Sequence, residues 1–407
     1  MNIIDGGATS AKGFKAACTA AGIKYKDRTD MAMLVSEAPC VTAGTFTRNL
    51  VKAAPVLWDR AIVESGSEAR AVVINAGIAN ACTGEEGFEA CRLSAEAVQE
   101  ICGFTPDQVF VASTGVIGAK LPVDRITAGI TAMAPALDPS REAGHNAARA
   151  IMTTDTLPKE ACVTIEIGGK IVTIGGMCKG SGMIHPNMGT MLCFITTDAA
   201  ISKALLQKAL SETVEETYNM VSVDGDTSTN DTCLVLANGL AGNDPIQKEN
   251  EAYVAFKEGL MEVNRTLAMK IAGDGEGATA LFEVIVEHAP SKEDAKVLSK
   301  SVVTSSLSKA AVYGHDANCG RFLCALGYSG VNFDPNLVDM YFVSEHGKLK
   351  VAQDGVILAY SEEKAAEIMT TEHFTVLCDM KQGEATATAW GCDLTHEYVT
   401  INADYRS

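Results

Sequence analysis

Short apolar runs, bounded by polar and turn-forming residues, predict buried β-strands along the chain. The clearest of these runs are Ala71–Asn75 (AVVIN), Val109–Ser113 (VFVAS), Cys233–Ala237 (CLVLA) and Leu281–Val286 (LFEVIV). Continuous apolar runs of this length are typical of strands covered on both faces. Two further segments predict hairpins: residues 164–174 turn at Gly168 and Gly169, and residues 340–351 turn near His346 and Gly347.

Longer segments with apolar residues at helical spacing predict helices between these strands. Three stand out: Phe88–Cys102 ending at Gly103, Ala199–Tyr218 with Asp198 as its N-cap, and Ala252–Ala272 ending at Gly273. Strand-like and helix-like segments are mixed throughout, and strands are expected near both ends of the chain. This pattern predicts an α/β fold, or more broadly a layered α+β enzyme.

The segment from Lys179 to Asp198 (KGSGMIHPNMGTMLCFITTD) has an unusual pattern. It opens with glycines and passes directly after Gly189 into the extended run Thr190–Ile195. A hydroxyl in this position can attack the preceding carbonyl, and hydrolysis of the resulting ester would cut the chain. Thr190 would then carry both a nucleophile and an α-amine with a reference pKa of about 7.7–8.0. An ordinary Thr at the start of a strand is the alternative, because Gly-Thr pairs are common.

A second candidate feature follows the strand predicted at residues 109–113. In VASTGVIGAK (residues 111–120) the chain runs into Ser113, Thr114 and Gly115, where backbone N–H groups can converge. Such a turn can form an oxyanion hole. It can equally be a plain strand-to-loop turn.

Two polar segments invite a metal-site interpretation that their spacing does not support. Residues 152–156 (MTTDT) and 222–232 (SVDGDTSTNDT) are rich in hydroxyls and carboxylates. An EF-hand loop counted from Asp224 would need Gly at its sixth position and Glu at its twelfth, where Thr229 and Val235 stand. A hydrogen-bonded turn network is therefore the favoured interpretation.

The loop at residues 271–280 (IAGDGEGATA) places Glu276 between glycines. Two carboxylates would repel phosphate, and neither a Walker motif nor a GxGxxG after a strand occurs in the sequence. Glu276 therefore suits a cationic ligand, although an acidic loop at a helix end is the simpler alternative.

The histidines and cysteines do not form a motif with metal-ligand or hydrolase spacing. The sequence contains no GxSxG motif that would supply a nucleophile for His185 or His315, and no HxxxH or HExxH pair occurs. The thirteen cysteines include no CxxC pair, which favours reduced, mostly buried thiols. We therefore expect no metal site.

The charge balance narrows the classes of partner. Lys and Arg number 33 against 51 Asp and Glu, a formal net charge of −18. So acidic a surface repels nucleic acid and anionic membranes. The opening segment Met1–Phe14 lacks the features of a secretory signal, and no apolar run is long enough for a membrane span. A cytoplasmic protein is the expectation.

Several segments together resemble the ornithine acetyltransferase (ArgJ) family of arginine biosynthesis, whose members process themselves and are related to the DmpA-type aminopeptidases. The resemblance spans essentially the whole chain. Besides residues 179–198, its carriers are STGVIG (113–118), MTTDTLPK (152–159), DGDTSTNDT (224–232), GDGEGAT (273–279) and the terminal NADYRS (402–407).

The resemblance implies a DmpA/ArgJ-like fold, cut between Gly189 and Thr190 into an α chain (1–189) and a β chain (190–407) that intertwine in one core and assemble as α2β2. It implies that Thr190 takes the acetyl group from N2-acetylornithine and passes it to glutamate by ping-pong transfer, with Thr114 and Gly115 in the oxyanion hole. The substrate-contacting positions would be Thr153, Lys179, Thr190, Glu276, Asn402 and Ser407. No bound cofactor is implied, and acetyl-CoA stays open as a second acetyl donor.

Some positions depart from the family pattern. Gly189 stands where the family usually has Ala, which should alter the cleavage rate more than the mechanism. The other departures concern substrate detail and efficiency: Ala76 and Ile78 replace Ser and Asn, Ala280 replaces Lys, and Cys319 replaces Trp.

Two other functions stay open at this point. A self-processing aminopeptidase or amidase would use water as the acceptor in place of glutamate. An uncleaved, non-catalytic scaffold would keep the fold and lose the chemistry.

Overall fold

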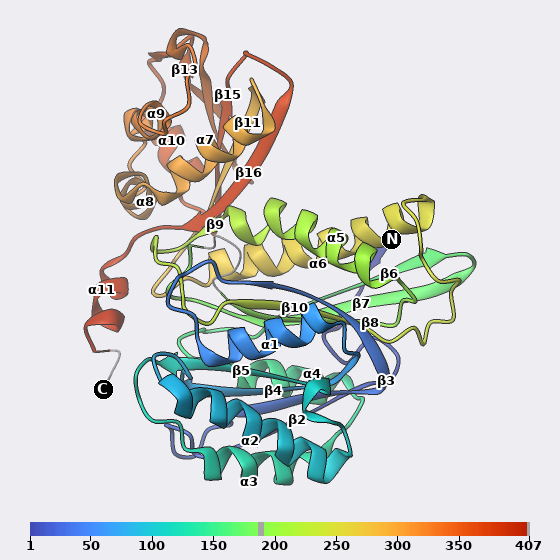
Figure 1. The fold of residues 1–407 in the computed structure, drawn as a ribbon. Coiled ribbons are helices and arrows are strands. Elements are labelled where there is room, and N and C mark those ends of the chain that lie inside the picture. The colour runs from blue at the N-terminus through green and yellow to red at the C-terminus, as the bar shows by residue number, and fades with distance from the viewer. Residues whose placement is uncertain (186–190, 405–407) are drawn as a thin grey trace. The chain divides into compact units, whose positions relative to one another are not determined.

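The computed structural model describes residues 1–185 and 191–404, which form two compact units. Unit 1 comprises residues 1–180, 186–218 and 227–267, and unit 2 comprises residues 181–185, 219–226 and 268–407. The chain therefore enters unit 2 twice for a few residues before it continues there from Ala268 onward (Figure 1).

A sheet of nine described strands forms the centre of unit 1, in the order β1-β6-β7-β8-β10-β3-β4-β5, with β2 paired to β3. The strands are β1 (Asn2–Ile3), β2 (Phe14–Thr19), β3 (Met31–Phe46), β4 (Ala69–Ile78), β5 (Val109–Val116), β6 (Lys159–Ile167), β7 (Lys170–Lys179), β8 (Leu192–Thr197) and β10 (Thr232–Ala237). The prediction of a mixed α/β fold is confirmed.

The long strand β3 joins two parts of this sheet. Its first part pairs with β2 and β4, and its last six residues pair with β10. The β3–β4 pairing shifts register between Val35 and Cys40. Residues of both parts, among them Phe110 of β5, Phe194 of β8 and Leu234 of β10, share one hydrophobic cluster. Strands that are three or four positions apart in the sheet order therefore pack into the same cluster.

Helices cover the strands of unit 1 on both faces. They are α1 (Ala54–Ser65), α2 (Gly84–Cys102), α3 (Val123–Met133), α4 (Arg141–Ala150), α5 (Lys203–Glu216) and α6 (Glu251–Gly273), with 3-10 turns at Pro106–Gln108, Ala134–Ala136 and Tyr218–Met220. In β4, Val73 packs in the cluster shared with α2 and α3, whereas Val72 and Ile74 pack in the cluster shared with α4. This double burial is the reason for the unbroken apolar run in β4. Figure 1 shows α2 and α3 along the β4–β5 part of the sheet.

Most predicted elements are confirmed, with one correction at a helix start. The hairpin at Gly168 and Gly169 joins β6 to β7, and Gly103 caps α2 with its N–H bonded to the carbonyl of Gln99. Asp198, however, does not cap a helix: α5 begins at Lys203 with Ser202 as its N-cap. The Asp198 carboxylate instead accepts hydrogen bonds from the backbone N–H groups of Lys12 and Thr173.

Unit 2 contains a second mixed sheet, whose described strands have the order β14-β13-β12-β15-β11-β16-β9. The strands are β9 (Val221–Ser222), β11 (Leu281–Ala289), β12 (Asp339–Ser344), β13 (Gly347–Gln353), β14 (Val356–Ile357), β15 (His373–Asp379) and β16 (Ala385–Cys392). The helices are α7 (Lys292–Thr304), α8 (Ser306–Tyr313), α9 (Cys319–Gly327), α10 (Glu362–Met369) and α11 (His396–Ala403), with a 3-10 turn at Pro335–Leu337. The predicted hairpin forms between β12 and β13, where Ser344 pairs with Gly347.

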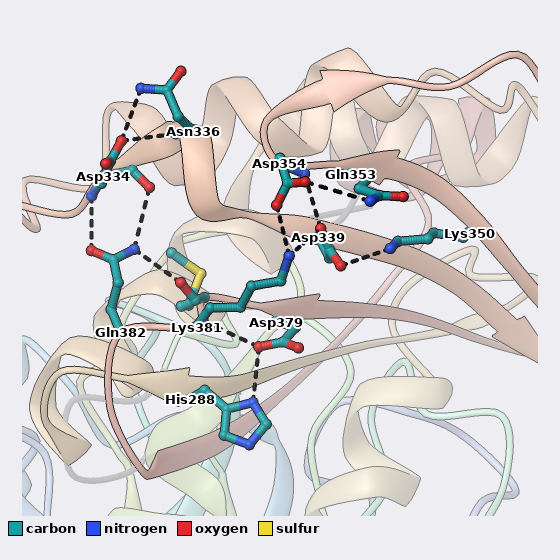
Figure 2. A network of polar contacts seen from close by, with 11 residues as sticks. His288, Asp334, Asn336, Asp339, Lys350, Gln353, Asp354, Asp379, Lys381 and Gln382 are labelled. Carbon is teal, nitrogen blue, oxygen red and sulfur yellow. Dashed lines mark hydrogen bonds and ion pairs between the residues drawn. The ribbon is translucent and has the colours of Figure 1, made fainter.

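A polar network holds together the strand ends at one edge of this second sheet (Figure 2). Asp339 accepts from Lys350 Nζ at 2.8 Å and from Lys381 Nζ at 2.7 Å, and Lys381 also pairs with Asp354 at 2.9 Å. Burial alone would raise the pKa of Asp339, but hydrogen bonds from the two lysines outweigh burial and lower it to about 2. These partners lie on or directly after β12, β13 and β15, so the network joins the ends of neighbouring strands.

Within the described residues, every helix is too short or too polar to cross a bilayer.

Candidate active site

The candidate residues from the sequence fall into three groups. Thr114, Gly115, Thr153 and Lys179 belong to unit 1. Glu276 and Asn402 belong to unit 2. Gly189, Thr190 and Ser407 lie outside the described residues, so the proposed cleavage point and nucleophile remain predictions.

Thr114 and Gly115 lie within β5, which continues to Val116 where the sequence suggested a turn after Ser113. The strand continues because its parallel pairing with β4 extends through Gly77 and Ile78. Gly115 has φ +125°, and an added Cβ would lie 2.2 Å from the carbonyl carbon of Gly77. Glycine is required here by both the backbone conformation and the close approach of the neighbouring strand.

Lys179, the last residue of β7, contacts this strand end. Its Nζ lies 3.3 Å from Thr114 Oγ1 and 3.9 Å from Asp155 Oδ2. Because an ammonium group can only donate, Thr114 Oγ1 is the acceptor, which leaves the Thr114 hydroxyl proton for donation to a second group. A positive charge and a hydroxyl donor therefore stand together beside Gly115.

Asp155 organises the surroundings of Lys179. Its carboxylate oxygens accept from Lys159 Nζ at 2.7 Å, from the Gly180 N–H at 2.7 Å and from the Thr153 N–H at 3.1 Å. Burial alone would raise the pKa of Asp155, but the ammonium groups of Lys179 and Lys159 outweigh burial and hold it well below its ordinary value. The carboxylate is therefore charged and compensates two buried lysines.

Thr153 belongs to the same cluster through this backbone contact with Asp155. It lies in the loop between α4 and β6, and its carbonyl accepts from the Arg28 guanidinium, as does that of Met152. The structure thus brings Thr153, Lys179 and Thr114 together around one carboxylate, although they are separated by up to 65 positions in sequence.

The loop before β10 carries a second buried carboxylate. Asp231 is 1% exposed, and its Oδ2 has no hydrogen-bond partner among the described residues. Burial raises the pKa of Asp231 well above its ordinary value, and the nearby positive charge of Lys179 acts in the opposite direction. Thr232 N–H donates to the carbonyl of Met191, so this loop lies beside the start of the chain segment that continues from residue 190.

In unit 2, Glu276 lies on the glycine-rich loop after α6 and is 6% exposed. Asn402 of α11 donates from Nδ2 to Glu276 Oε2 at 2.7 Å. An added Cβ at Gly182 would lie 2.4 Å from the Glu276 carboxyl group, so a side chain is excluded at that position. The structure therefore brings Glu276 and Asn402 together, and their role in binding substrate stays a prediction.

The aspartate-rich segment in unit 2 forms a turn network. Asp224 accepts from the N–H groups of Met183, Ile184 and Asp226. Within the described residues, no cluster of three or more His, Cys, Asp or Glu side chains has metal-ligand geometry. His185 lies 3.0 Å from Ser222 Oγ through Nδ1. Burial, helped by the positive charge of Lys300, lowers the pKa of His185 to about 4.

The cysteines nearest the strand ends are buried. Cys193 of β8 lies 3.2 Å from the hydroxyl of Tyr218, and burial raises the pKa of the Cys193 thiol well above its usual value. A neutral thiol in this position is a poor nucleophile, in keeping with the reduced, buried thiols that the sequence predicts.

The structure adds residues that the sequence did not identify as part of the site. Asp155 and Lys159 stand four positions apart in MTTDTLPK, but the segment is not a helix, so this spacing carried no signal. Asn230 and Asp231 were interpreted only as turn residues. Asn230 lies beside β5 through its contact with Ser113, more than a hundred positions away in sequence. The same loop lies beside the start of β8 through the contact of Thr232 with Met191, about forty positions away.

The unit 1 cluster can hold a carboxylate on Lys179 and can present hydroxyl and backbone donors to a developing negative charge at the end of β5. The unit 2 pair presents a carboxylate oriented by an amide, which suits an ammonium group.

Comparison with known proteins identifies the family. The model of the ArgJ family matches residues 15–407. The arginine biosynthesis bifunctional protein ArgJ of Symbiobacterium thermophilum is 52% identical over 413 aligned residues, covering 100% of both chains. The glutamate N-acetyltransferase of Methanocaldococcus jannaschii is 45% identical over 412 aligned residues, again covering 100% of both chains. A solved ArgJ chain from Bacillus halodurans is 41% identical, covers 52% of this chain and 97% of its own, and has a TM-score of 0.49. With a family match over nearly its whole length and relatives that are similar from end to end, the chain belongs to the ArgJ family of arginine-biosynthesis acetyltransferases.

Proposed function

We propose that the chain is a glutamate N-acetyltransferase that cuts itself between Gly189 and Thr190 and then transfers acetyl from N2-acetyl-L-ornithine to L-glutamate. The observation that carries this proposal is the contact of the Lys179 ammonium with the Thr114 hydroxyl beside the positive-φ Gly115. That arrangement supports an anion-stabilising site at the end of β5, in contact with Lys179 of β7, which pairs with Leu192 of β8.

In the first half-reaction, the Thr190 hydroxyl attacks the acetyl carbonyl carbon of N2-acetylornithine while the freed α-amine of Thr190 takes the hydroxyl proton. Thr114 and the Gly115 N–H stabilise the oxyanion of the tetrahedral intermediate. The C–N bond then breaks, the proton passes to the leaving amine, and ornithine departs. The acetyl group is left as an ester on Thr190.

In the second half-reaction, the amine of glutamate attacks this ester, and the acetyl group returns to nitrogen while Thr190 recovers its proton. Since the amide that is broken and the amide that is formed are nearly identical, the transfer is close to thermoneutral. Rate acceleration must come from the covalent intermediate, the oxyanion donors and the exclusion of water.

Other candidate residues suit the charged groups of the substrates. Lys179 fits the α-carboxylate, and Thr153 and Ser407 are proposed to be further substrate-contacting residues. Glu276, oriented by Asn402, fits the ornithine ammonium. No bound cofactor is needed. A cytoplasmic location and an α2β2 assembly remain parts of the proposal.

The relative from Symbiobacterium thermophilum is named as a bifunctional protein. For this reason acetyl-CoA should be assayed as a second acetyl donor to glutamate, alongside acetylornithine.

The test combines mass analysis with a product assay. Purified wild-type protein should give two fragments, one beginning Thr-Met-Leu-Cys, and should form acetylglutamate faster than free acetate. Thr190→Ala should remain a single chain of 42.8 kDa without transferase activity. Thr131→Ala, which changes an exposed Thr on α3, is the matched control and should cleave and react normally.

Two outcomes would contradict the proposal. Acetate release without acetylglutamate would favour the aminopeptidase or amidase alternative. Full activity from an uncleaved chain would remove Thr190 as an N-terminal nucleophile.

A further inference from the structure

The loop that leads into β10 is hydrogen-bonded to the strand end that carries Thr114 and Gly115. Asn230 Nδ2 donates to the carbonyl oxygen of Ser113 at 2.9 Å and lies 3.2 Å from Ser113 Oγ. Ser113 directly precedes Thr114 and is 1% exposed. These contacts join residues that are 117 positions apart within unit 1.

The orientation of the Asn230 amide is fixed by its own neighbours. Thr229 Oγ1 donates to Asn230 Oδ1 at 2.7 Å, and the Asn230 N–H donates to Ser228 Oγ at 3.2 Å. With its oxygen already accepting a hydrogen bond, the amide presents its NH2 group to Ser113. Asn230 is 7% exposed, so water does not compete freely for these contacts.

Ser113 is also held from the side of β4. The backbone N–H of Asn80 donates to Ser113 Oγ at 2.8 Å. Ser113 is thus held by Asn80 at its hydroxyl and by Asn230 at its carbonyl.

We propose that Asn230 is a positioning residue for the oxyanion hole, an inference that rests on the proposed function of Thr114 and Gly115. The physical link is the peptide plane between Ser113 and Thr114. A bond to the Ser113 carbonyl fixes this planar peptide, and with it the position of the Thr114 Cα atom, from which the Thr114 hydroxyl and the peptide that carries the Gly115 N–H both extend. Gly115, without a side chain and at φ +125°, relies on its neighbours for its orientation.

A matched control exists in the same unit. Asn238 Nδ2 donates to the carbonyl of Lys12 at 2.8 Å and lies 3.2 Å from Ser36 Oγ, and Asn238 is 9% exposed. It makes the same two kinds of contact as Asn230, but to residues outside the candidate site. A role in stability alone should therefore affect both asparagines equally.

The experiment compares Asn230→Ala with Asn238→Ala, measuring the melting temperature, the cleaved fraction, and kcat and KM for acetylornithine per mole of cleaved enzyme. Both variants should lose similar thermal stability. Only Asn230→Ala should lose kcat, by roughly 10- to 100-fold with KM little changed, because misplaced donors weaken transition-state binding. If the alanine variants do not fold, Asn230→Asp and Asn238→Asp keep the side-chain volume and are compared in the same way.

A double variant separates this inference from the proposed function. Thr114→Ala should itself lower kcat, and adding Asn230→Ala to it should lower kcat much less than in the wild type, because both act on the same oxyanion. If Thr114→Ala lowers kcat while the Asn230 and Asn238 variants have equal kcat, the positioning role of Asn230 is wrong, and the proposed function stands. The same conclusion follows if the losses of the two single variants are additive. If Thr114→Ala keeps full kcat, the oxyanion assignment fails and the inference fails with it.

Discussion

At the scale of single residues, the negative charge of the buried Asp155 carboxylate compensates the two buried lysines of the unit 1 cluster. Asp155 bonds to Lys159, stands 3.9 Å from Lys179 and accepts two backbone N–H groups. Without it, two ammonium groups would be buried side by side. Asp59, equally buried on α1, shows the opposite case: its carboxylate accepts from the Val111 N–H, and burial raises its pKa well above the ordinary value.

Asp155→Asn should lower the free energy of unfolding at pH 7 by about 3–5 kcal/mol, the usual effect of removing one partner of a buried ion pair. Because the pKa of Asp155 is lower in the folded than in the unfolded state, its stabilisation is complete above the unfolded value of about 3.9 and is lost as the pH falls below it. The loss caused by the substitution should therefore shrink between pH 7 and pH 3 in denaturant titrations.

Asp59→Asn is the control for this pH dependence. A raised folded pKa destabilises the charged form, so the stability of this variant relative to wild type should improve as the pH rises from 3 to 7. If both variants show the same pH trend, the assignment of the two carboxylates is wrong.

At the scale of elements, the parallel pairing of β4 and β5 shapes the proposed oxyanion site. Gly77 and Gly115 face each other in register, both with positive φ, and the backbones approach too closely for a side chain. Ala76, one of the departures from the family pattern, pairs with Thr114 in the same register. The positive φ at Gly115 is therefore a feature of the paired strands β4 and β5, and not of β5 by itself.

Gly115→Ala should destabilise the protein by clearly more than Gly118→Ala. Both glycines have positive φ, which costs a non-glycine residue about 1–2 kcal/mol. A Cβ at Gly118 meets open space, whereas one at Gly115 lies 2.2 Å from the backbone of Gly77. Chemical denaturation of both variants measures the difference. Equal losses would show that β4 and β5 are less closely apposed than described.

At the scale of the whole chain, the unit 1 sheet is built from strands on both sides of residue 190. β8 and β10, which follow residue 190, lie between β7 and β3, which precede it. β7 pairs with β8 from Lys179 opposite Leu192 to Ile174 opposite Thr197, and β10 pairs with β3 over six residues. Any cut in this region leaves two pieces that share one sheet and one hydrophobic cluster.

After the proposed cleavage, residues 1–189 and 190–407 should remain together in native size-exclusion chromatography, because separation would break two strand pairings in the centre of the sheet. Concentrated guanidinium should separate them. The uncleaved Thr190→Ala chain serves as the reference for the elution volume. A fragment that elutes alone under native conditions would contradict this arrangement.

Local patterns in the sequence were sufficient to predict many strands, turns and helix ends of both units. The apolar runs of β4, β5, β10 and β11, the Gly168–Gly169 turn and the Gly103 cap were predicted correctly, because strand burial and turn chemistry act within a few residues. The family motifs predict site roles for Thr114, Lys179, Glu276 and Asn402. These roles stay predictions, and the structure shows only that the residues form two contacting pairs, one in each unit.

Tertiary structure alone decided which of these local features meet. The sequence predicts Asp198 as a helix N-cap, yet its carboxylate accepts hydrogen bonds from the N–H groups of Lys12 and Thr173. Asn230 contacts Ser113 across the sheet, where β3 pairs with β4 in its first part and with β10 in its last part. Such contacts depend on how strands a hundred residues apart in sequence pack against each other. The hydrophobic pattern of a short segment shows that it is buried but does not show which distant segment it packs against.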